Sequence, residues 1–174
     1  MPSSLNNLIR EIPDFPQPGI IFKDITPLLA NSKALLQVSK LVSEQALECD
    51  FIAGIEARGF VLASAACALS SKGFIPIRKS GKLPGKTVSR DYDLEYGKAS
   101  LEVHTDLIPH GSKVLLVDDV LATGGTAIAA TNLLKDIGLT VSSLVFLLDI
   151  PELNGKARIK TTLNDPQMTI ILAN

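Results

Sequence analysis

The stretch from residue 114 to residue 138 constrains the fold most, because an apolar strand leads through two acids and a glycine-rich turn into a helix. Residues 114–117 are apolar without interruption, which is typical of a strand buried on both faces of a parallel sheet. Residues 126–137 carry apolar side chains at helical spacing, and Gly138 follows them as a helix stop. We therefore predict one strand–helix unit of an open parallel sheet.

The same alternation repeats along the chain. We expect helices over residues 5–12, about 33–49 and 59–69, and strands over residues 51–55, 74–77, 141–148 and 169–172. Pro13 would end the first helix, and Pro76 would place its strand at a sheet edge or at a strand end. The 174 residues therefore predict a single α/β domain, built as a doubly wound parallel sheet with helices on both faces.

Residues 79–98 interrupt this alternation. They include four glycine or proline residues and many charges, and the segment is too long for an ordinary connection in a compact α/β domain. Apolar and polar side chains then alternate over residues 99–107, as in a strand with one solvated face. We expect a hairpin arm whose tip is a flexible lid over about residues 79–99.

Composition excludes several classes of partner. Lys and Arg number 17 against 18 Asp and Glu, and this near-neutral balance argues against nucleic acid and membrane surfaces as partners. The apolar runs are far shorter than the ~20 residues that span a bilayer, and residues 1–7 lack the basic start and apolar core of a secretory leader. Cys49 and Cys67 match no zinc spacing and predict two reduced, buried thiols in a cytoplasmic protein.

The turn between the acids and the helix has the chemistry of a phosphate site. Gly124 and Gly125 let backbone N–H groups approach a ligand closely, and the following helix directs its positive dipole end to the same place. Thr123 and Thr126 add hydroxyl donors. Because ligands of open parallel sheets bind at the carboxyl ends of strands, residues 122–126 are predicted to hold a phosphate monoester.

Asp118 and Asp119 serve a different purpose, because carboxylates repel a phosphate. They can accept hydrogen bonds from sugar hydroxyls beyond the phosphate, and they can stabilise positive charge that develops on the sugar ring. The simpler alternative is a strand end with two capping acids and a glycine turn. The occurrence of both acids and the Thr-Gly-Gly-Thr turn in one register favours the sugar phosphate site.

Residues 114–126 resemble the 5-phosphoribosyl-1-pyrophosphate (PRPP) signature of the type I phosphoribosyltransferases. Four further segments narrow the resemblance to the adenine phosphoribosyltransferases, namely residues 22–29, 56–60, 78–85 and 92–97. In order and spacing these segments extend the resemblance from about residue 9 to residue 148. The resemblance implies a type I phosphoribosyltransferase-like fold with a small N-terminal hood over about residues 1–30.

The resemblance also implies a reaction, in which adenine and PRPP give AMP and pyrophosphate through an oxocarbenium-like transition state, as part of purine salvage. It assigns catalysis to Glu95, Asp118 and Asp119, with Glu95 as the general acid or base that handles the proton lost by adenine. It places Tyr96 in the lid. The implied binding residues are Ala122, Thr123, Gly124, Gly125 and Thr126 for the 5-phosphate, Arg58, Arg78, Lys79 and Lys82 for pyrophosphate, and Ile21, Phe22 and Lys23 for adenine.

The sequence contains no His, Cys and carboxylate cluster with metal-ligand spacing, so we expect no protein metal site. We expect Mg²⁺ to be the cofactor and to bind mainly through PRPP and pyrophosphate, because this ion keeps much of its water and often rides on substrate phosphates. The family is typically a homodimer, so a second copy of the chain is the expected protein partner.

Three other functions compete with this interpretation. Residues 80–87 come close to a P-loop, but Ser80 replaces its first glycine and no apolar helix follows Thr87. A PRPP-sensing regulator would need a DNA-binding module, and the about 20 residues before the predicted adenine-binding residues of the hood are too few for one. The third alternative is the same transfer to another base, such as xanthine or orotate.

Overall fold

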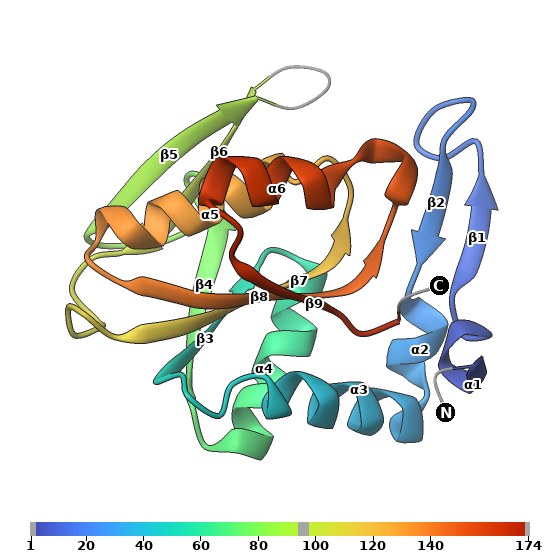
Figure 1. Cartoon of the computed structure of the whole chain (residues 1–174), viewed down its shortest axis with the longest axis horizontal. Helices are drawn as coiled ribbons and strands as arrows, with labels where there is room; N and C mark the ends of the chain where they lie inside the picture. Colours follow the sequence, from blue (N-terminus) through green and yellow to red (C-terminus); the bar gives the residue numbers. More distant parts are fainter. Residues whose placement is uncertain (1–2, 94–97, 173–174) are drawn as a thin grey trace.

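The computed structural model describes residues 3–93 and 98–172, and it has three layers in which helices cover both faces of one twisted sheet (Figure 1). Seven strands form this sheet in the order β5-β6-β4-β3-β7-β8-β9, and β3, β4, β7, β8 and β9 run parallel. Their bounds are β3 (Phe51–Ile55), β4 (Gly73–Lys79), β5 (Thr87–Asp93), β6 (Lys98–His104), β7 (Lys113–Leu121), β8 (Thr140–Asp149) and β9 (Gln167–Ile170). The predicted doubly wound sheet is thus confirmed.

Each face of the sheet has its own apolar core. One core contains buried residues of α2 (Thr26–Ala30), α3 (Ser32–Glu44) and α4 (Arg58–Ser70), which lie below the sheet in Figure 1. The other contains buried residues of α5 (Gly125–Asp136) and α6 (Gly155–Leu163), which lie above it. Since the central strands are covered on both sides, their sequences are continuously apolar rather than alternating.

The chain reverses its direction of winding between β3 and β7, which are neighbours in the sheet. α4 follows β3 on one face, whereas α5 follows β7 on the other face. Two helices that leave adjacent strand ends toward opposite faces open a crevice at the carboxyl edge, which is where ligands of such sheets bind.

The N-terminal segment departs from the predicted helix over residues 5–12. The helix α1 (Ser3–Asn6) is short, and β1 (Arg10–Pro13) pairs antiparallel with β2 (Ile21–Asp24). The apolar side chains between Leu5 and Ile12 fit a helical period, but pairing with β2 decides the conformation. An ion pair of 2.6 Å between Arg10 and Asp24 reinforces that pairing.

Other boundaries also differ from expectation. The helix predicted over residues 33–49 ends at Glu44, and α2, α6, β2 and the 3₁₀ turn η1 (Pro151–Leu153) were not predicted. The strand of Pro76 lies inside the sheet order, but β6 pairs with β4 only at Arg78 and Lys79. Pro76 therefore has a paired strand, β3, on one side alone, and the unpaired side is where a missing N–H costs no hydrogen bond of the sheet.

The predicted hairpin arm is confirmed, and it consists of β5 and β6. β5 and β6 pair antiparallel from Thr87 opposite His104 to Asp93 opposite Lys98. Seven of the 20 residues in the expected irregular loop therefore form strand β5, which packs against α5. Arg90 donates hydrogen bonds of 2.6–2.9 Å to the Asp136 carboxylate at the end of that helix. Within residues 3–93 and 98–172, no helix is both long enough and apolar enough to cross a membrane.

Candidate active site

The predicted phosphate turn lies at the carboxyl end of β7, between the last strand residue and α5. Gly124 adopts a left-handed conformation, with φ of +79°, and caps the helix, so a side chain there would be strained. A small cavity of about 60 Å³ opens beside this turn. It is lined by Asp118, Val120, Leu121, Ala122, Thr123, Gly124, Thr126, Ala127 and Phe146, and so by four of the five residues predicted for the phosphate, all but Gly125, and by one of the acids.

The acid pair forms the floor next to the turn. The Asp118 carboxylate accepts a hydrogen bond of 2.9 Å from the backbone N–H of Asp119. Asp118 keeps part of its surface open to the cavity, but protein atoms surround the carboxyl. This burial raises the pKa of Asp118 well above its ordinary value, and the neighbouring Asp119 charge raises it further. Burial also raises the pKa of Asp119, although the Arg58 guanidinium opposes that rise.

Arg58 joins the acid pair to the hood. Its Nε lies 2.7 Å from Oδ2 of Asp119, an ion pair whose N–H is not aligned as a hydrogen bond to that oxygen. Its Nη1 donates to the backbone carbonyl of Lys23 at 3.2 Å, and its Cζ lies 4.8 Å from the ring centroid of Phe22. A single cation therefore contacts the residues predicted for the sugar and those predicted for the base.

Gly59 allows the start of α4 to come this close to β7. A Cβ atom on Gly59 would lie 3.0 Å from both the Asp118 carboxylate and the Val117 carbonyl. A larger residue would push α4 away from the acids. The absence of a side chain at Gly59 thus keeps Arg58 within reach of Asp119.

The cations predicted for pyrophosphate lie at the end of β4 and in the connection to β5. Two carboxylates that the sequence analysis did not identify hold this segment in place. Glu56 accepts hydrogen bonds from Arg78 at 2.9 and 3.2 Å and from the N–H of Lys79 at 3.0 Å. These contacts, led by Arg78, lower the pKa of Glu56. Arg78 also donates to the carbonyl of Lys82 at 3.1 Å.

Glu102 is the second organising carboxylate and is only 5% exposed. It accepts the N–H groups of Lys82 and Leu83, both at 2.6 Å. Although its burial acts in the opposite direction, these N–H groups hold the pKa of Glu102 below its ordinary value. Both carboxylates contact residues about 20 positions away in the sequence, so no local pattern indicated them.

The hood presents a free strand edge to the site. In an antiparallel pair, the N–H and C=O groups of alternate residues point away from the partner strand. The Lys23 carbonyl accepts a hydrogen bond from Arg58, so the N–H and C=O groups of Lys23 point away from β1. Those of Ile21, two residues earlier in β2, point the same way. Phe22 packs edge-to-face on Phe15, with ring centroids 5.2 Å apart.

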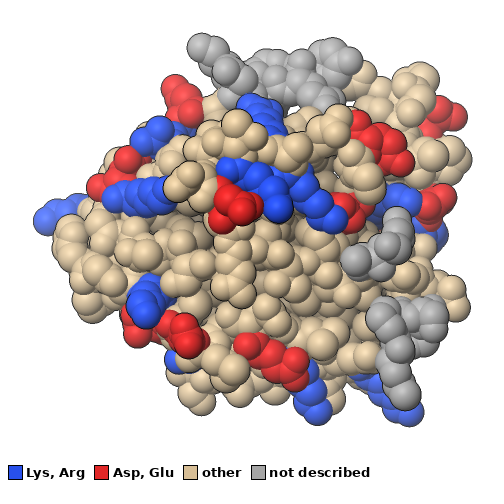
Figure 2. Space-filling model, viewed as in Figure 1, with Lys and Arg blue, Asp and Glu red and all other residues tan. Residues whose placement is uncertain are grey.

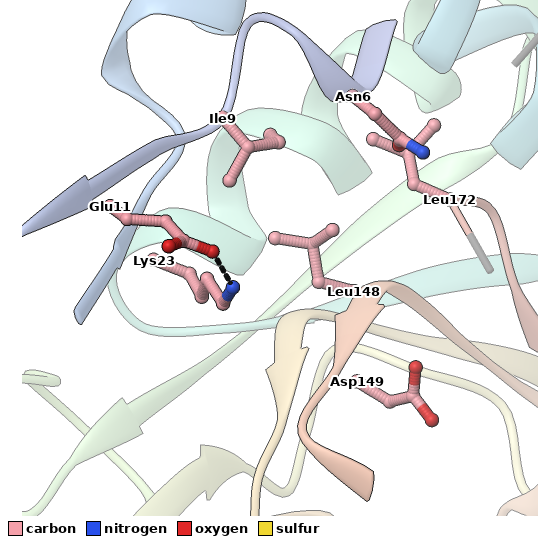
Figure 3. Close-up of a pocket in the computed structure, with 7 residues that line it drawn as sticks. All are labelled: Asn6, Ile9, Glu11, Lys23, Leu148, Asp149 and Leu172. Carbon is pink, nitrogen blue, oxygen red and sulfur yellow. Dashed lines mark hydrogen bonds and ion pairs between the residues drawn. The ribbon is translucent and has the colours of Figure 1, made fainter. Parts of the chain in front are cut away.

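The Lys23 side chain does not point to the free edge of β2. Its ammonium group forms an ion pair with Glu11 of β1 (Figure 3). Both residues border a cavity of about 220 Å³ between the hood and the end of β8. Figure 3 shows Leu148 and Asp149 on the opposite wall of this cavity. The full lining is Asn6, Ile9, Glu11, Lys23, Leu148, Asp149 and Leu172.

Two predicted site residues, Glu95 and Tyr96, lie outside the described residues. Within the described part of the chain, no group of three His, Cys, Asp or Glu side chains is arranged to hold a metal ion. Cys49 and Cys67 are both free and buried. Positive and negative side chains are interspersed on the face drawn in Figure 2. The P-loop alternative is excluded because β5, and not a helix, begins at Thr87.

Comparison with known proteins gives the class to which this geometry belongs. The model of the phosphoribosyl transferase domain matches residues 24–165. An adenine phosphoribosyltransferase of Thermobifida fusca is 48% identical over 157 residues, which cover 89% of each chain. The crystal structure of the adenine phosphoribosyltransferase from Thermoanaerobacter pseudethanolicus superimposes with a TM-score of 0.91 at 40% identity, over 98% of each chain.

The enzyme of the same name from Saccharomyces cerevisiae, solved with an imino-altritol bisphosphate and adenine, superimposes with a TM-score of 0.88 at 34% identity, over 98% of each chain. The chain belongs to the phosphoribosyltransferase family and, within it, to the adenine phosphoribosyltransferases.

Proposed function

We infer that the chain transfers the 5-phosphoribosyl group of PRPP to adenine, giving AMP and pyrophosphate, a reaction of purine salvage. The bond between the anomeric carbon and pyrophosphate breaks, and a bond from that carbon to an imidazole nitrogen of adenine forms. The observation that carries this inference is the position of Asp118 and Asp119 near the carboxyl end of β7, the strand that leads into the glycine turn at the switch point of the sheet. The relatives named above support the choice of adenine.

We propose that the ribose 5-phosphate binds to the backbone and hydroxyl groups of residues 122–126. The turn precedes α5, a helix of 12 residues, whose first N–H groups lack partners within the helix. A phosphate dianion satisfies these donors and interacts favourably with the positive end of the helix dipole. Thr123 and Thr126 supply hydroxyls that a backbone turn alone would lack.

Asp118 and Asp119 then face the ribose. Hydroxyl groups of the sugar donate to the carboxylates and so favour their charged form, which burial disfavours in the free protein. The negative charge is thereby available as positive charge develops at the anomeric carbon, and it stabilises the oxocarbenium-like transition state. Arg58, which pairs with Asp119 in the free protein, is one of the cations we assign to pyrophosphate.

We assign the other pyrophosphate contacts to Arg78, Lys79 and Lys82. Glu56 and Glu102 accept the backbone N–H groups of this segment, which leaves the ammonium groups of the two lysines for the ligand. Mg²⁺, when it is bound with PRPP, neutralises charge on the leaving pyrophosphate. The residues present fit an ion carried by the substrate. A magnesium ion bound to substrate phosphates takes only one or two carboxylates from the protein, and Asp118 and Asp119 would supply them.

Adenine recognition is assigned to the free edge of β2. The C=O of Ile21 can accept from the 6-amino group of adenine, and the N–H of Lys23 can donate to the adjacent ring nitrogen. A 6-oxo purine has an acceptor where adenine has its 6-amino donor, and a donor where adenine has its acceptor nitrogen. It would leave unpaired polar atoms in the site, and we expect discrimination against it of about 10⁴-fold. Phe22 adds apolar packing to the same strand.

The proton released by adenine is assigned to Glu95, with Tyr96 beside it in the lid formed by the β5–β6 hairpin. The hood over about residues 1–30 and the lid over about residues 79–99 would act as parts of one domain of residues 1–174. Closure of such a lid excludes water and prevents hydrolysis of PRPP. We further propose a homodimer and a cytoplasmic location, and the two free buried cysteines support a reducing compartment.

The experiment that tests this function supplies PRPP and Mg²⁺ with adenine, hypoxanthine, guanine, xanthine or orotate and measures pyrophosphate release. We expect turnover with adenine that exceeds turnover with every other base by at least about 10³-fold. Turnover with hypoxanthine or orotate in place of adenine would refute the assignment of the hood.

A further inference from the structure

We propose that Gly155, at the start of α6, is a positioning residue for the phosphate turn of residues 122–126, in the reaction proposed above. Gly155 is buried and lies 29 residues or more beyond that turn in the sequence. It belongs to none of the segments that resemble the family signature. Its contacts nevertheless fix the backbone that is proposed to hold the 5-phosphate.

The absence of a side chain at Gly155 allows an unusually close approach to the turn. A Cβ atom at this position would meet the Ala122 carbonyl oxygen well inside 3.0 Å, a separation that real Cβ atoms essentially never show. It would also lie 2.9 Å from Cδ1 of Leu121 and 3.1 Å from the carbonyl carbon of Ala122. The first of these partners is backbone, so the contact could be relieved only by moving the turn or the helix.

The contact is mutual. A Cβ atom on Gly124 would lie 3.0 Å from the Gly155 carbonyl oxygen and 3.1 Å from Cγ1 of Ile159, a fully buried residue one turn further along α6. The first turn of α6 and the phosphate turn therefore pack backbone against backbone, through two glycines that face each other.

Two further contacts fix the segment that leads from β8 into α6 and the start of that helix. The N–H of Ile150 donates to the Leu121 carbonyl at 2.9 Å, which ties the end of β8 to the end of β7. Lys156 forms an ion pair of 2.6 Å with Asp149, whose side chain is only 6% exposed. These contacts and the fully buried Ile159 side chain resist movement of α6, so we expect an added methyl group at Gly155 to displace the turn.

Displacement of the Ala122 carbonyl would reorient a proposed phosphate donor. The peptide between Ala122 and Thr123 is trans and planar, so the Thr123 N–H points opposite to the Ala122 C=O and thus away from α6. A shift of the carbonyl tilts this N–H by the same rotation. Misplacement of a substrate-binding group by on the order of 1 Å can lower the rate about 10²-fold, so the contact at Gly155 affects catalysis.

The test compares Gly155→Ala with Ala157→Ser, which also adds one heavy atom but at an exposed position of the same helical turn. The measurements are the Kd of ribose 5-phosphate and of AMP by titration calorimetry, KM and kcat for PRPP and adenine, and the melting temperature. For Gly155→Ala we expect Kd values at least 10-fold higher and kcat/KM for PRPP about 100-fold lower, with KM for adenine within twofold. For Ala157→Ser we expect wild-type values.

Unchanged Kd values in folded Gly155→Ala would overturn the proposal, as would an equal loss for PRPP and adenine, which indicates general destabilisation. If Gly155→Ala does not fold, the proposal is tested with Ile159→Val, which removes a methyl group that packs next to Gly124. We expect a several-fold rise in the Kd of ribose 5-phosphate, and an unchanged value would overturn the proposal. Ligand binding is measured without turnover, so an inactive wild-type protein would refute the proposed function and leave this result interpretable.

Discussion

The ion pair between Arg58 and Asp119 predicts that removal of either partner lowers turnover but changes stability in opposite directions. Arg58→Met keeps the length of the side chain and removes its charge, which leaves the Asp119 carboxylate, 9% exposed, without its cation. Loss of one partner from a fully buried pair costs about 3–5 kcal/mol. The Arg58 side chain is 34% exposed, so solvent screening reduces the expected cost to about 2 kcal/mol.

For a chain of 174 residues, a loss of about 2 kcal/mol lowers the melting temperature by roughly 4–8 °C. Asp119→Asn has the opposite effect, because it removes one of two adjoining buried charges and relieves the repulsion on Asp118. We expect its melting temperature to be equal to or above that of the wild type. Its kcat should fall by about 10²–10³-fold, since it removes charge that stabilises the transition state.

Thermal unfolding near pH 7 and steady-state pyrophosphate release measure the two effects, and Arg158→Met, at an exposed arginine, is the matched control. The reasoning is refuted if Asp119→Asn unfolds as early as Arg58→Met, because Asp119 would then act as a structural anchor rather than as a charge held for catalysis.

Three further predictions follow from single carboxylates. Glu95→Gln should lower kcat far more than it changes the affinity for PRPP, and unchanged turnover would remove Glu95 from the mechanism. Glu102→Ala leaves the N–H groups of Lys82 and Leu83 without their acceptor, so we expect a loss of about 2 kcal/mol and a higher KM for PRPP, with a smaller effect of Glu102→Gln, which keeps an acceptor oxygen. Thermal unfolding and PRPP titration of both variants check this. Because burial raises the pKa of Asp118, its contribution to stability is fully present below the unfolded-state pKa of about 3.9 and is lost as pH rises through the folded-state pKa. Asp118→Asn should therefore flatten the fall in melting temperature between the unfolded-state and the folded-state pKa of Asp118, and an unchanged pH profile would contradict the raised pKa.

The sheet and the phosphate turn could be predicted from the sequence because both depend on local pattern. Residues 51–55 and 114–117 are continuously apolar, and such runs between amphipathic helices have few arrangements other than a covered parallel sheet. The acids lie near the carboxyl end of β7 and the glycine turn follows that strand, so the predicted strand also located the carboxyl edge of the sheet.

The hood was expected from the family resemblance, but local sequence pattern could predict neither its two strands nor the helix α6. β1 and β2 have four residues each, and their conformation depends on pairing with each other rather than on their own periodicity. In α6 only Gly155 and Ile159 are buried, so the helix lacks an apolar stripe that a sequence pattern could reveal. The roles of Glu56 and Glu102 depend on contacts across strands, which composition and spacing do not encode.

A crystal structure of the protein with AMP would test the central claim most directly. We predict the 5′-phosphate on the backbone of residues 122–126, the two ribose hydroxyls within hydrogen-bond distance of Asp118 and Asp119, and the adenine ring against the free edge of β2. A nucleotide bound elsewhere, or one whose phosphate lies away from the turn before α5, would contradict the account.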